Sequence, residues 1–231
     1  MEGAHCVLLD IEGTICPISF VKETLFPYAI KALPDVLNRQ WHDPEFQQLR
    51  DAFPEEHRAS PSALQAHVED LTRRDVKIAY LKNLQGYLWK DGYSTGAYTT
   101  PLFPEVAPQL QRWKEQGAKL AIYSSGSVFA QKLLFQHVKR DDKTEDLTHL
   151  IDGWFDTTNA GLKNEAASYE KIAEALGLGA GQILFLTDNV KEVDAAKDAG
   201  MRAILVDRPG NAPVSDMDRH RMHVVDTLEA V

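Results

Sequence analysis

Cysteine is scarce in this sequence, and features of secreted or membrane proteins are missing from it. The 231 residues include two cysteines, Cys6 and Cys16, whose spacing matches neither a CxxC metal motif nor a disulfide framework. The sequence contains no Asn-x-Ser/Thr motif, no secretory signal pattern and no apolar run of roughly 18 residues. We therefore expect an intracellular protein of a reducing compartment that does not cross a membrane, with Cys6 buried as a free thiol on a strand.

Positive charge is also in short supply. The chain has 25 Lys and Arg residues against 34 Asp and Glu, which gives a formal net charge of −9, and no run is rich in Lys or Arg. A basic face for nucleic acid is therefore not expected. Hydrophobic residues make up 44% and charged residues 26% of the chain, which indicates a folded globular protein rather than a disordered one.

The first residues and the second half of the chain alternate between short apolar runs and amphipathic segments. Apolar strands separated by helices predict a doubly wound parallel sheet that is covered on both faces, an α/β fold. The expected strands are 6–9, 118–124, 153–158, 182–189 and 202–210, the last of the chain, and the expected helices are 104–117, 127–138, 165–177 and 190–200.

Residues 20–98 break this alternation. They contain helix-like segments at 20–33, 63–74 and 75–92 with no convincing strand between them. We expect residues 1–19 plus 99–231 to form the α/β core and 20–98 to form a helical cap inserted after the first strand. The turn-rich residues 96–103 have the composition of a hinge.

Polar residues stand where three of the predicted strands end. Asp10 ends the first apolar run, Ser124 and Ser125 end another, and Asp188 ends "ILFLTD". Ligands of open parallel sheets bind outside the carboxyl ends of the strands, so these groups are expected to converge. Two buried acids brought together repel each other, and Mg²⁺, which prefers oxygen ligands and phosphate, resolves this repulsion.

Groups that suit an anion complete this pattern. The hydroxyls and backbone of "SSGS" offer donors at the start of a helix, and Lys163, in a loop, offers a fixed positive charge. Together with the acids they indicate a phosphoryl-transfer site. The plainer readings are helix capping for Ser124 and Ser125, a solvated surface side chain for Lys163, and turn formation for Asp10 and Asp188.

The motifs occur in the order found in a known superfamily. "DIEGT" (residues 10–14), "YSSGS" (123–127), Lys163 and "LTDNVKE" (186–192) resemble the four motifs of the haloacid dehalogenase superfamily. The longer strings "YSSGSVFAQKLLF", "GWFDT", "ILFLTDN" and "RPGNAP" make the chain similar, from near residue 6 to near 213, to the enolase-phosphatases of the methionine salvage pathway. This resemblance implies a haloacid dehalogenase-like, Rossmannoid core.

The resemblance also implies roles for individual residues. Asp10 would be the nucleophile that forms an aspartyl-phosphate, and Glu12 would be the general acid and base. One Mg²⁺ ion per subunit would be held by Asp10, Glu12 (through its main-chain carbonyl) and Asp188. Ser124, Ser125 and Lys163 would bind the phosphoryl oxygens, with Glu192 behind them.

The substrate of the resembled family is a phosphorylated diketone, 2,3-diketo-5-methylthiopentyl-1-phosphate. It is enolised and then dephosphorylated to the acireductone 1,2-dihydroxy-3-keto-5-methylthiopentene. Glu12 stands where the superfamily motif has an aspartate. Our hypothesis is that its additional methylene gives the reach needed to serve both steps.

Two other functions share these core residues. One is a small-molecule phosphatase of the same superfamily with another substrate, and the other is a receiver-like phosphate-sensing module. Glu12 argues against the module, because a group placed to hydrolyse the acyl phosphate would not let it be stored. A dehalogenase is disfavoured, since its chemistry does not require Glu12, Lys163 and Asp188 together. We further expect a monomer that acts on a small molecule in the cytoplasm, with the nucleus as an additional location.

Overall fold

The computed structural model describes residues 3–231, and these divide into two compact units. Of the described residues, the first unit consists of 3–20 and Thr99–Val231, and the second consists of Val21–Tyr98. Among the described residues, no helix combines the length and the apolar character that crossing a membrane requires.

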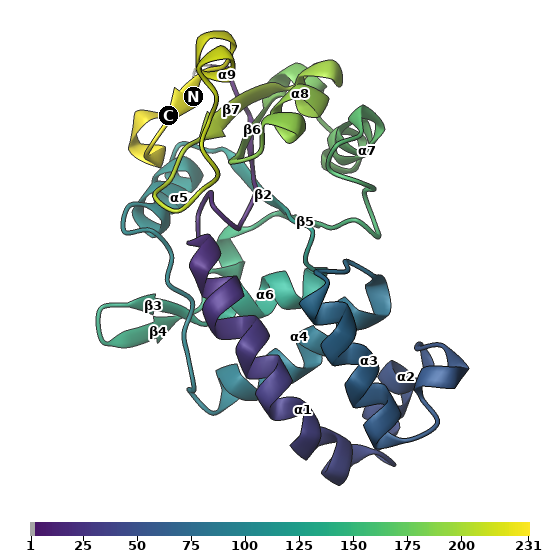
Figure 1. The fold of residues 1–231 in the computed structure, drawn as a ribbon. Coiled ribbons are helices and arrows are strands. Elements are labelled where there is room, and N and C mark those ends of the chain that lie inside the picture. The colour runs from purple at the N-terminus through teal and green to yellow at the C-terminus, as the bar shows by residue number, and fades with distance from the viewer. Residues whose placement is uncertain (1–2) are drawn as a thin grey trace. The chain divides into compact units, whose positions relative to one another are not determined.

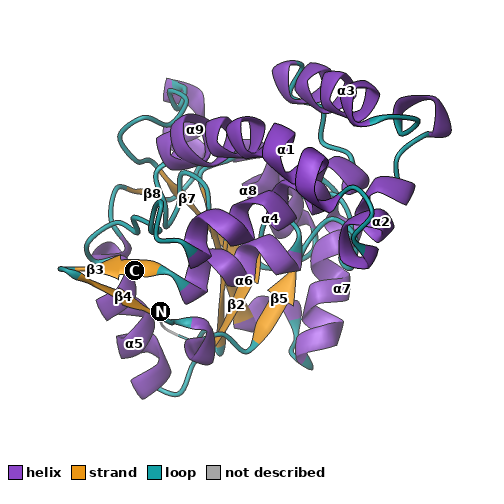
Figure 2. Ribbon diagram, turned by 90° about the horizontal axis from the view of Figure 1, so that it is seen from below, coloured by secondary structure: helices purple, strands orange, loops and turns teal. Residues whose placement is uncertain are grey.

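A six-stranded parallel sheet forms the centre of the first unit, with the order β5-β2-β1-β6-β7-β8. Figures 1 and 2 show its strands with α5 on one side and α7 on the other. The predicted parallel α/β core is therefore confirmed. The strands are β1 (Cys6–Leu9), β2 (Lys119–Tyr123), β5 (Gly153–Phe155), β6 (Ile183–Thr187), β7 (Arg202–Val206) and β8 (Val224–Val225).

Apolar side chains hold α7 and α8 against this sheet. Tyr169 and Ile172 of α7 and Val193 of α8 are fully buried in a cluster with Leu8 and Phe185 from the strands. Burial of such side chains stabilises each by about 1.5–3 kcal/mol relative to exposure. The helices of the unit are α5 (Val106–Glu115), α6 (Val128–Gln136), α7 (Ala166–Leu176), α8 (Val190–Asp198) and α9 (Asp216–Arg221).

The strand and turn expected over residues 202–210 are present, with β7 as the strand, but the expectation that this is the last strand of the chain is wrong. Strand β8 pairs in parallel with β7, where Leu205 lies opposite Val224 and Val206 opposite Val225. A hairpin of β3 (Val138–Arg140) and β4 (Lys143–Glu145) was also not anticipated. Both additions are very short, so neither leaves a strand-like run of apolar residues in the sequence.

The second unit is helical throughout its regular structure. A π-helical turn at Phe20–Leu25 leads into α1 (Phe26–Gln40), which packs against α3 (Pro61–Arg73) and α4 (Ala79–Ser94). Helix α2 (Pro44–Asp51), which was not expected, starts where the Asp43 side chain accepts a hydrogen bond from the Glu45 N–H. The predicted helix over 75–92 begins later, at Ala79.

Candidate active site

Asp10 follows the central strand of the parallel sheet. Strand β1 lies between β2 and β6, and the backbone N–H of Asp10 donates to the Leu186 carbonyl at 2.9 Å. The carboxylate is 6% exposed. One of its oxygens accepts from the Ile11 N–H at 2.8 Å and the other from the Thr187 hydroxyl at 3.3 Å. Backbone and side chain of Asp10 are thus both fixed.

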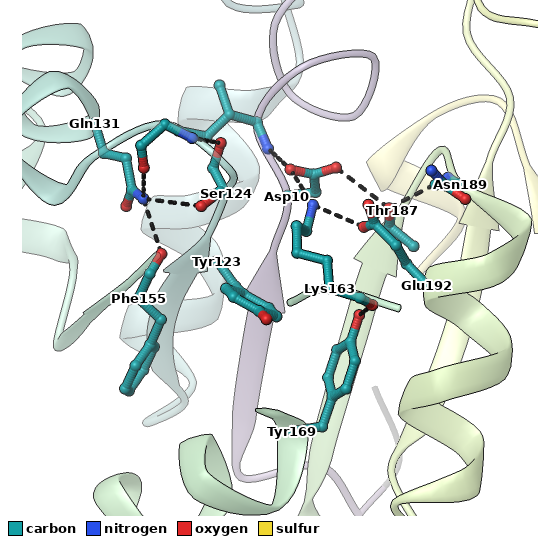
Figure 3. Close-up of polar contacts among 12 residues, drawn as sticks. Asp10, Tyr123, Ser124, Gln131, Phe155, Lys163, Tyr169, Thr187, Asn189 and Glu192 are labelled. Carbon is teal, nitrogen blue, oxygen red and sulfur yellow. Dashed lines mark hydrogen bonds and ion pairs between the residues drawn. The ribbon is translucent and has the colours of Figure 1, made fainter. Parts of the chain in front are cut away.

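Lys163 joins Asp10 to Glu192 (Figure 3). Its Nζ lies 2.8 Å from Asp10 Oδ1 and 2.7 Å from Glu192 Oε2, and all three side chains are nearly buried. Burial by itself lowers the pKa of Lys163, but the two carboxylates outweigh that effect and raise the pKa above its ordinary value. Lys163 therefore remains charged, as an anion-binding group must.

The loop that carries Lys163 is fixed by side-chain hydroxyls. Three consecutive carbonyls, those of residues 161–163, accept hydrogen bonds from Tyr123 (2.8 Å), Ser168 (2.8 Å) and Tyr169 (2.7 Å), respectively. Figure 3 shows the Tyr169 hydroxyl directed at the loop beside the Lys163 side chain. These bonds explain how a loop, rather than a helix or strand, holds the lysine in one place.

Asp188 lies beyond the tip of β6, close enough to Asp10 for their charges to interact. Burial, followed by the negative charges of Asp10 and Glu192, raises the pKa of Asp188 to about 7. Burial and the charge of Asp10 also raise the pKa of Glu192. The centre thus holds more carboxylates than the single ammonium group of Lys163 can neutralise.

Glu12 is half-buried in a tight turn directly after Asp10. The Ile11 carbonyl accepts from the N–H groups of Ile15 and Cys16, each at 3.0 Å, and the Gly13 N–H donates to the Cys16 carbonyl at 2.8 Å. Gly13 has φ +73°, and a Cβ at this position would lie 2.5 Å from Asp188 Oδ2. Only glycine permits both this conformation and this close approach.

Ser124 and Ser125 lie between the tip of β2 and helix α6. The buried Ser124 hydroxyl accepts from the Gly126 N–H at 3.3 Å, and Ser125 is half-buried. Gln131 of α6 fixes this segment, because its Nε2 lies 2.8 Å from the Gly126 carbonyl and 2.8 Å from the Phe155 carbonyl. The capping role of the segment falls to Ser127, whose side chain accepts from the Ala130 N–H.

The structure brings the sequence-predicted groups to one edge of the sheet. Asp10 contacts Lys163, Asp188 lies within electrostatic range of Asp10, and Ser124 follows the neighbouring strand. Several supporting residues were not singled out from the sequence, namely Thr187, Gln131, Tyr123, Ser168 and Asn211. Thr187 donates to the carboxylates of Asp10 and Glu192, and the others donate to backbone carbonyls. Such contacts leave no motif in a sequence.

The donor set fits a hard cation held by few protein ligands. The carboxylates of Asp10 and Asp188 offer oxygen ligands, and the negative charge of Asp10 contributes to the raised pKa of Asp188 although Lys163 pairs with Asp10. Among residues 3–231, no three His, Cys, Asp or Glu side chains form a cluster that could enclose a metal. Two acidic side chains near each other suit Mg²⁺, which keeps several waters and is bound by one or two carboxylates together with phosphate.

Comparison with known proteins agrees with this geometry. Residues 4–200 match the family described as haloacid dehalogenase-like hydrolase. Curated relatives named enolase-phosphatase E1 occur in Podospora anserina (57% identity, 97% of this chain and 96% of the relative) and in Neurospora crassa (56% identity, 100% and 99%).

Solved structures give the same result. The UTR4 protein of Saccharomyces cerevisiae superimposes with a TM-score of 0.86 at 40% identity, covering 99% of this chain and 100% of that one. A dehalogenase with an intermediate complex matches at a TM-score of 0.59 and 18% identity over 100% of this chain and 96% of that one, a likeness of fold alone. The chain belongs to the haloacid dehalogenase-like hydrolases and, within them, to the family of the enolase-phosphatases.

Proposed function

We propose that this protein is an Mg²⁺-dependent enolase-phosphatase of methionine salvage. It converts 2,3-diketo-5-methylthiopentyl-1-phosphate to the acireductone 1,2-dihydroxy-3-keto-5-methylthiopentene and phosphate. The observation that carries this proposal is the buried Asp10 carboxylate, held by Lys163 at the tip of the central strand beside the Ser124 segment. This arrangement supports a nucleophile facing a bound phosphoryl group.

Asp10 and Glu12 divide the chemical work in this proposal. Glu12 removes a proton from the carbon beside a ketone, and the electron pair moves to the carbonyl oxygen, which takes a proton from solvent to give the enol. Asp10 then attacks phosphorus, the bond from phosphorus to the substrate oxygen breaks, and Glu12 supplies the proton to that oxygen. Finally Glu12 takes a proton from water as the water oxygen attacks phosphorus, and the bond from phosphorus to the Asp10 oxygen breaks to free phosphate and the carboxylate. Glu12 then gives this proton to solvent.

Other residues hold the substrate and the cation. Ser124, Ser125 and Lys163 bind the phosphoryl oxygens, and the raised pKa of Lys163 supports a permanent charge there. Asp10, the main-chain carbonyl of Glu12, and Asp188 would hold one Mg²⁺ per subunit. The bound ion supplies positive charge that offsets the repulsion between carboxylate and phosphate.

A two-signal assay tests this function. Incubation with the diketo phosphate and Mg²⁺, followed by acireductone absorbance and free phosphate together, should show both products in equal amounts. Phosphate without the enol chromophore would favour a phosphatase with another substrate. No turnover of any phosphoester, with an aspartyl-phosphate that lasts for minutes, would favour the receiver-like module.

We also propose that Val21–Tyr98 acts as the cap of this enzyme. Its support is its all-helical structure and its place in the chain, between the turn that carries Glu12 and the rest of the core. Hydrogen exchange measured with and without a non-hydrolysable diketo phosphonate should show slower exchange within 21–98 on binding. Unchanged exchange throughout that unit would contradict the proposal.

The remaining proposals concern the whole molecule in the cell. We propose a monomer located in the cytoplasm and also in the nucleus, with no nucleic-acid partner. The net charge of −9 supports the last point, since it disfavours binding to polyanions. Light scattering after gel filtration tests the monomer, and imaging of a fluorescent fusion tests the location.

A further inference from the structure

The segment "RPGNAP", residues 208–213, has no part in the mechanism above, although it lies against the catalytic turn. It follows strand β7, which is the second neighbour of β1 in the sheet. Two of its side chains, Arg208 and Asn211, reach back across roughly 200 positions of sequence to the backbone just after Glu12.

Arg208 is a buried anchor that joins several segments of the first unit. Its Nε donates to the Thr14 carbonyl at 3.1 Å, one terminal nitrogen donates to the Asp226 carbonyl at 2.8 Å, and the other donates to the carboxylate of Glu105. The guanidinium carbon also lies 4.2 Å from the centre of the Phe103 ring. A planar guanidinium with this many directed contacts has very little freedom to move.

Asn211 holds Gly13, the residue that precedes Thr14 in the turn. Its Nδ2 donates to the Gly13 carbonyl at 2.9 Å and lies 3.3 Å from the Val206 carbonyl, at the end of β7. Its own N–H donates to the Arg208 carbonyl at 3.1 Å, so the two residues form one turn. The carbonyls of residues 13 and 14 are thus tied one after the other to the same rigid loop.

The two catalytic carboxylates differ in what fixes them. Asp10 is held by β6 through its backbone, and its side chain is held by Lys163, by Thr187 and by the Ile11 N–H, so only the last of these contacts comes from the turn. The backbone at Glu12 belongs instead to the turn whose next two carbonyls the loop holds. Loss of the loop contacts should therefore displace Glu12 far more than Asp10.

The space around Gly13 limits the direction of such a displacement. A Cβ at Gly13 would lie 2.5 Å from Asp188 Oδ2 and 2.8 Å from Asn211 Oδ1, so the turn is packed between these two side chains. Without the Asn211 side chain, the turn has room to move away from Asp188. An ångström of such movement is enough to lower a rate by about 100-fold.

We infer that Asn211 and Arg208 are positioning residues, which clamp the turn so that Glu12 is held in place for its proton transfers. This inference rests on the proposed role of Glu12 as general acid and base. It adds a positioning function for residues 208–213, which contribute no atom to the reaction.

The test compares Asn211→Ala, Glu12→Gln and the double variant in full-length protein with Mg²⁺. In Asn211→Ala we expect kcat for the diketo phosphate to fall about 10- to 100-fold. The inhibition constant of inorganic phosphate should change much less than kcat, because Ser124, Ser125 and Lys163, the proposed ligands of the phosphoryl oxygens, are anchored outside the turn. Exchange of the substrate's acidic C–H proton in D₂O should slow with kcat, which reports on proton removal directly.

The double variant separates positioning from a general structural effect. If Asn211 acts through Glu12, adding Asn211→Ala to Glu12→Gln should lower the rate by less than about twofold more. Multiplication of the two separate effects would overturn the inference, as would an unchanged kcat in Asn211→Ala. Arg208→Lys, which keeps the positive charge near Glu105 but cannot make all the contacts, is a second variant expected to lose kcat without weaker phosphate binding.

Two controls make a failure interpretable. Gln182→Ala removes an amide side chain at the opposite end of β6 and should leave kcat unchanged, and the thermal midpoint of each variant shows that it is folded.

If Glu12→Gln keeps full rates in both steps, the proposed role of Glu12 is wrong and the inference falls with it. If Glu12→Gln is slow but both loop variants are fully active, only the clamp is wrong.

Discussion

At the scale of single residues, the site depends on side chains whose pKa values are shifted by burial and by neighbouring charges. Lys163 is surrounded by carboxylates and keeps its charge, whereas burial and two like charges resist the ionisation of Asp188. Burial has the largest effect on the ionisation of the two cysteines, both of which are fully buried free thiols. Each of these environments leads to a measurable result.

The first prediction concerns the length of the acid-base side chain. Glu12→Asp shortens the carboxylate by one methylene while keeping its charge. If reach is what lets one group serve both steps, at least one step should slow by about tenfold or more, enolisation being followed by proton exchange and the phosphatase step by phosphate release. Full rates in both steps would contradict our hypothesis on the reach of Glu12.

The second prediction concerns thiol reactivity. Burial, with a smaller contribution from Asp152, raises the pKa of Cys6 to about 12, and burial with the charge of Glu12 raises that of Cys16 further. At pH 8 only about one Cys6 in ten thousand is a thiolate, which is the reactive form. A disulfide reagent at pH 8 should therefore label neither cysteine in the native protein and both after unfolding; rapid labelling of the native protein would contradict this burial.

The same pKa shifts have a consequence for alkaline stability. A folded pKa raised above the unfolded value of 9.0 favours folding fully below pH 9, and this contribution is lost as pH rises toward 12. Cys6→Ala should therefore show a smaller loss of unfolding free energy between pH 9 and pH 10.5 than the unsubstituted protein.

At the scale of elements, loops carry the chemistry and helices hold the loops. Helix α7 supplies Ser168 and Tyr169 to the loop of Lys163, and helix α6 supplies Gln131 to the segment of Ser124. Each helix is in turn buried against the first unit's own core. The precision of the loops therefore derives from helix packing.

The third prediction follows from this support. Tyr169→Phe removes the hydroxyl that donates to the Lys163 carbonyl, and loss of this partly buried hydrogen bond should lower the unfolding free energy by about 1 kcal/mol. Because Lys163 becomes less well placed, KM for the phosphoester and the inhibition constant of phosphate should both rise severalfold. Steady-state kinetics and denaturant unfolding measure the two effects.

A capping variant provides the control for Tyr169→Phe. Ser215→Ala removes the N-cap of α9 and should cost about 1 kcal/mol of stability with no change in KM. Equal changes in KM for the two variants would mean that lost stability, and not the position of Lys163, causes the effect.

At the scale of the whole molecule, the proposed catalytic centre trades stability for function. Ionised Asp188 is unfavourable here, because the side chain is largely buried and lies near the negative charges of Asp10 and Glu192. Its folded pKa of about 7 lies above its ordinary value of 3.8, so its contribution favours folding below pH 3.8 and is lost as pH rises through 7.

The fourth prediction tests this trade in the intact protein. Without metal at pH 8, Asp188→Asn should raise the thermal midpoint, because it removes a carboxylate that repels its neighbours. With millimolar Mg²⁺ the order should reverse, because ion binding stabilises only the protein that keeps the ligand. A midpoint of the unsubstituted protein that does not respond to Mg²⁺ would contradict the proposed metal site.

The sequence by itself determined the parallel α/β core and the positions of its main strands, because apolar runs are local features. It did not determine every strand end, since β5 ends at Phe155 and β7 at Val206, before the ends expected. It also placed Asp10, Ser124 and Asp188 at one edge, since strand order in such sheets brings carboxyl ends together. It missed β8 and the β3–β4 hairpin, whose few residues are stabilised by pairing partners distant in the chain rather than by their own pattern.

Only the tertiary structure decided how the catalytic groups are held. Backbone carbonyls accept the hydrogen bonds that fix each loop. Tyr169 donates to the Lys163 loop, Gln131 donates to the Ser124 segment, and Arg208 and Asn211 donate to the turn of Glu12. Every residue has a backbone carbonyl, so the identity of the acceptor leaves no trace in the sequence. Which carbonyl meets which donor is fixed by the packing of segments that lie far apart along the chain.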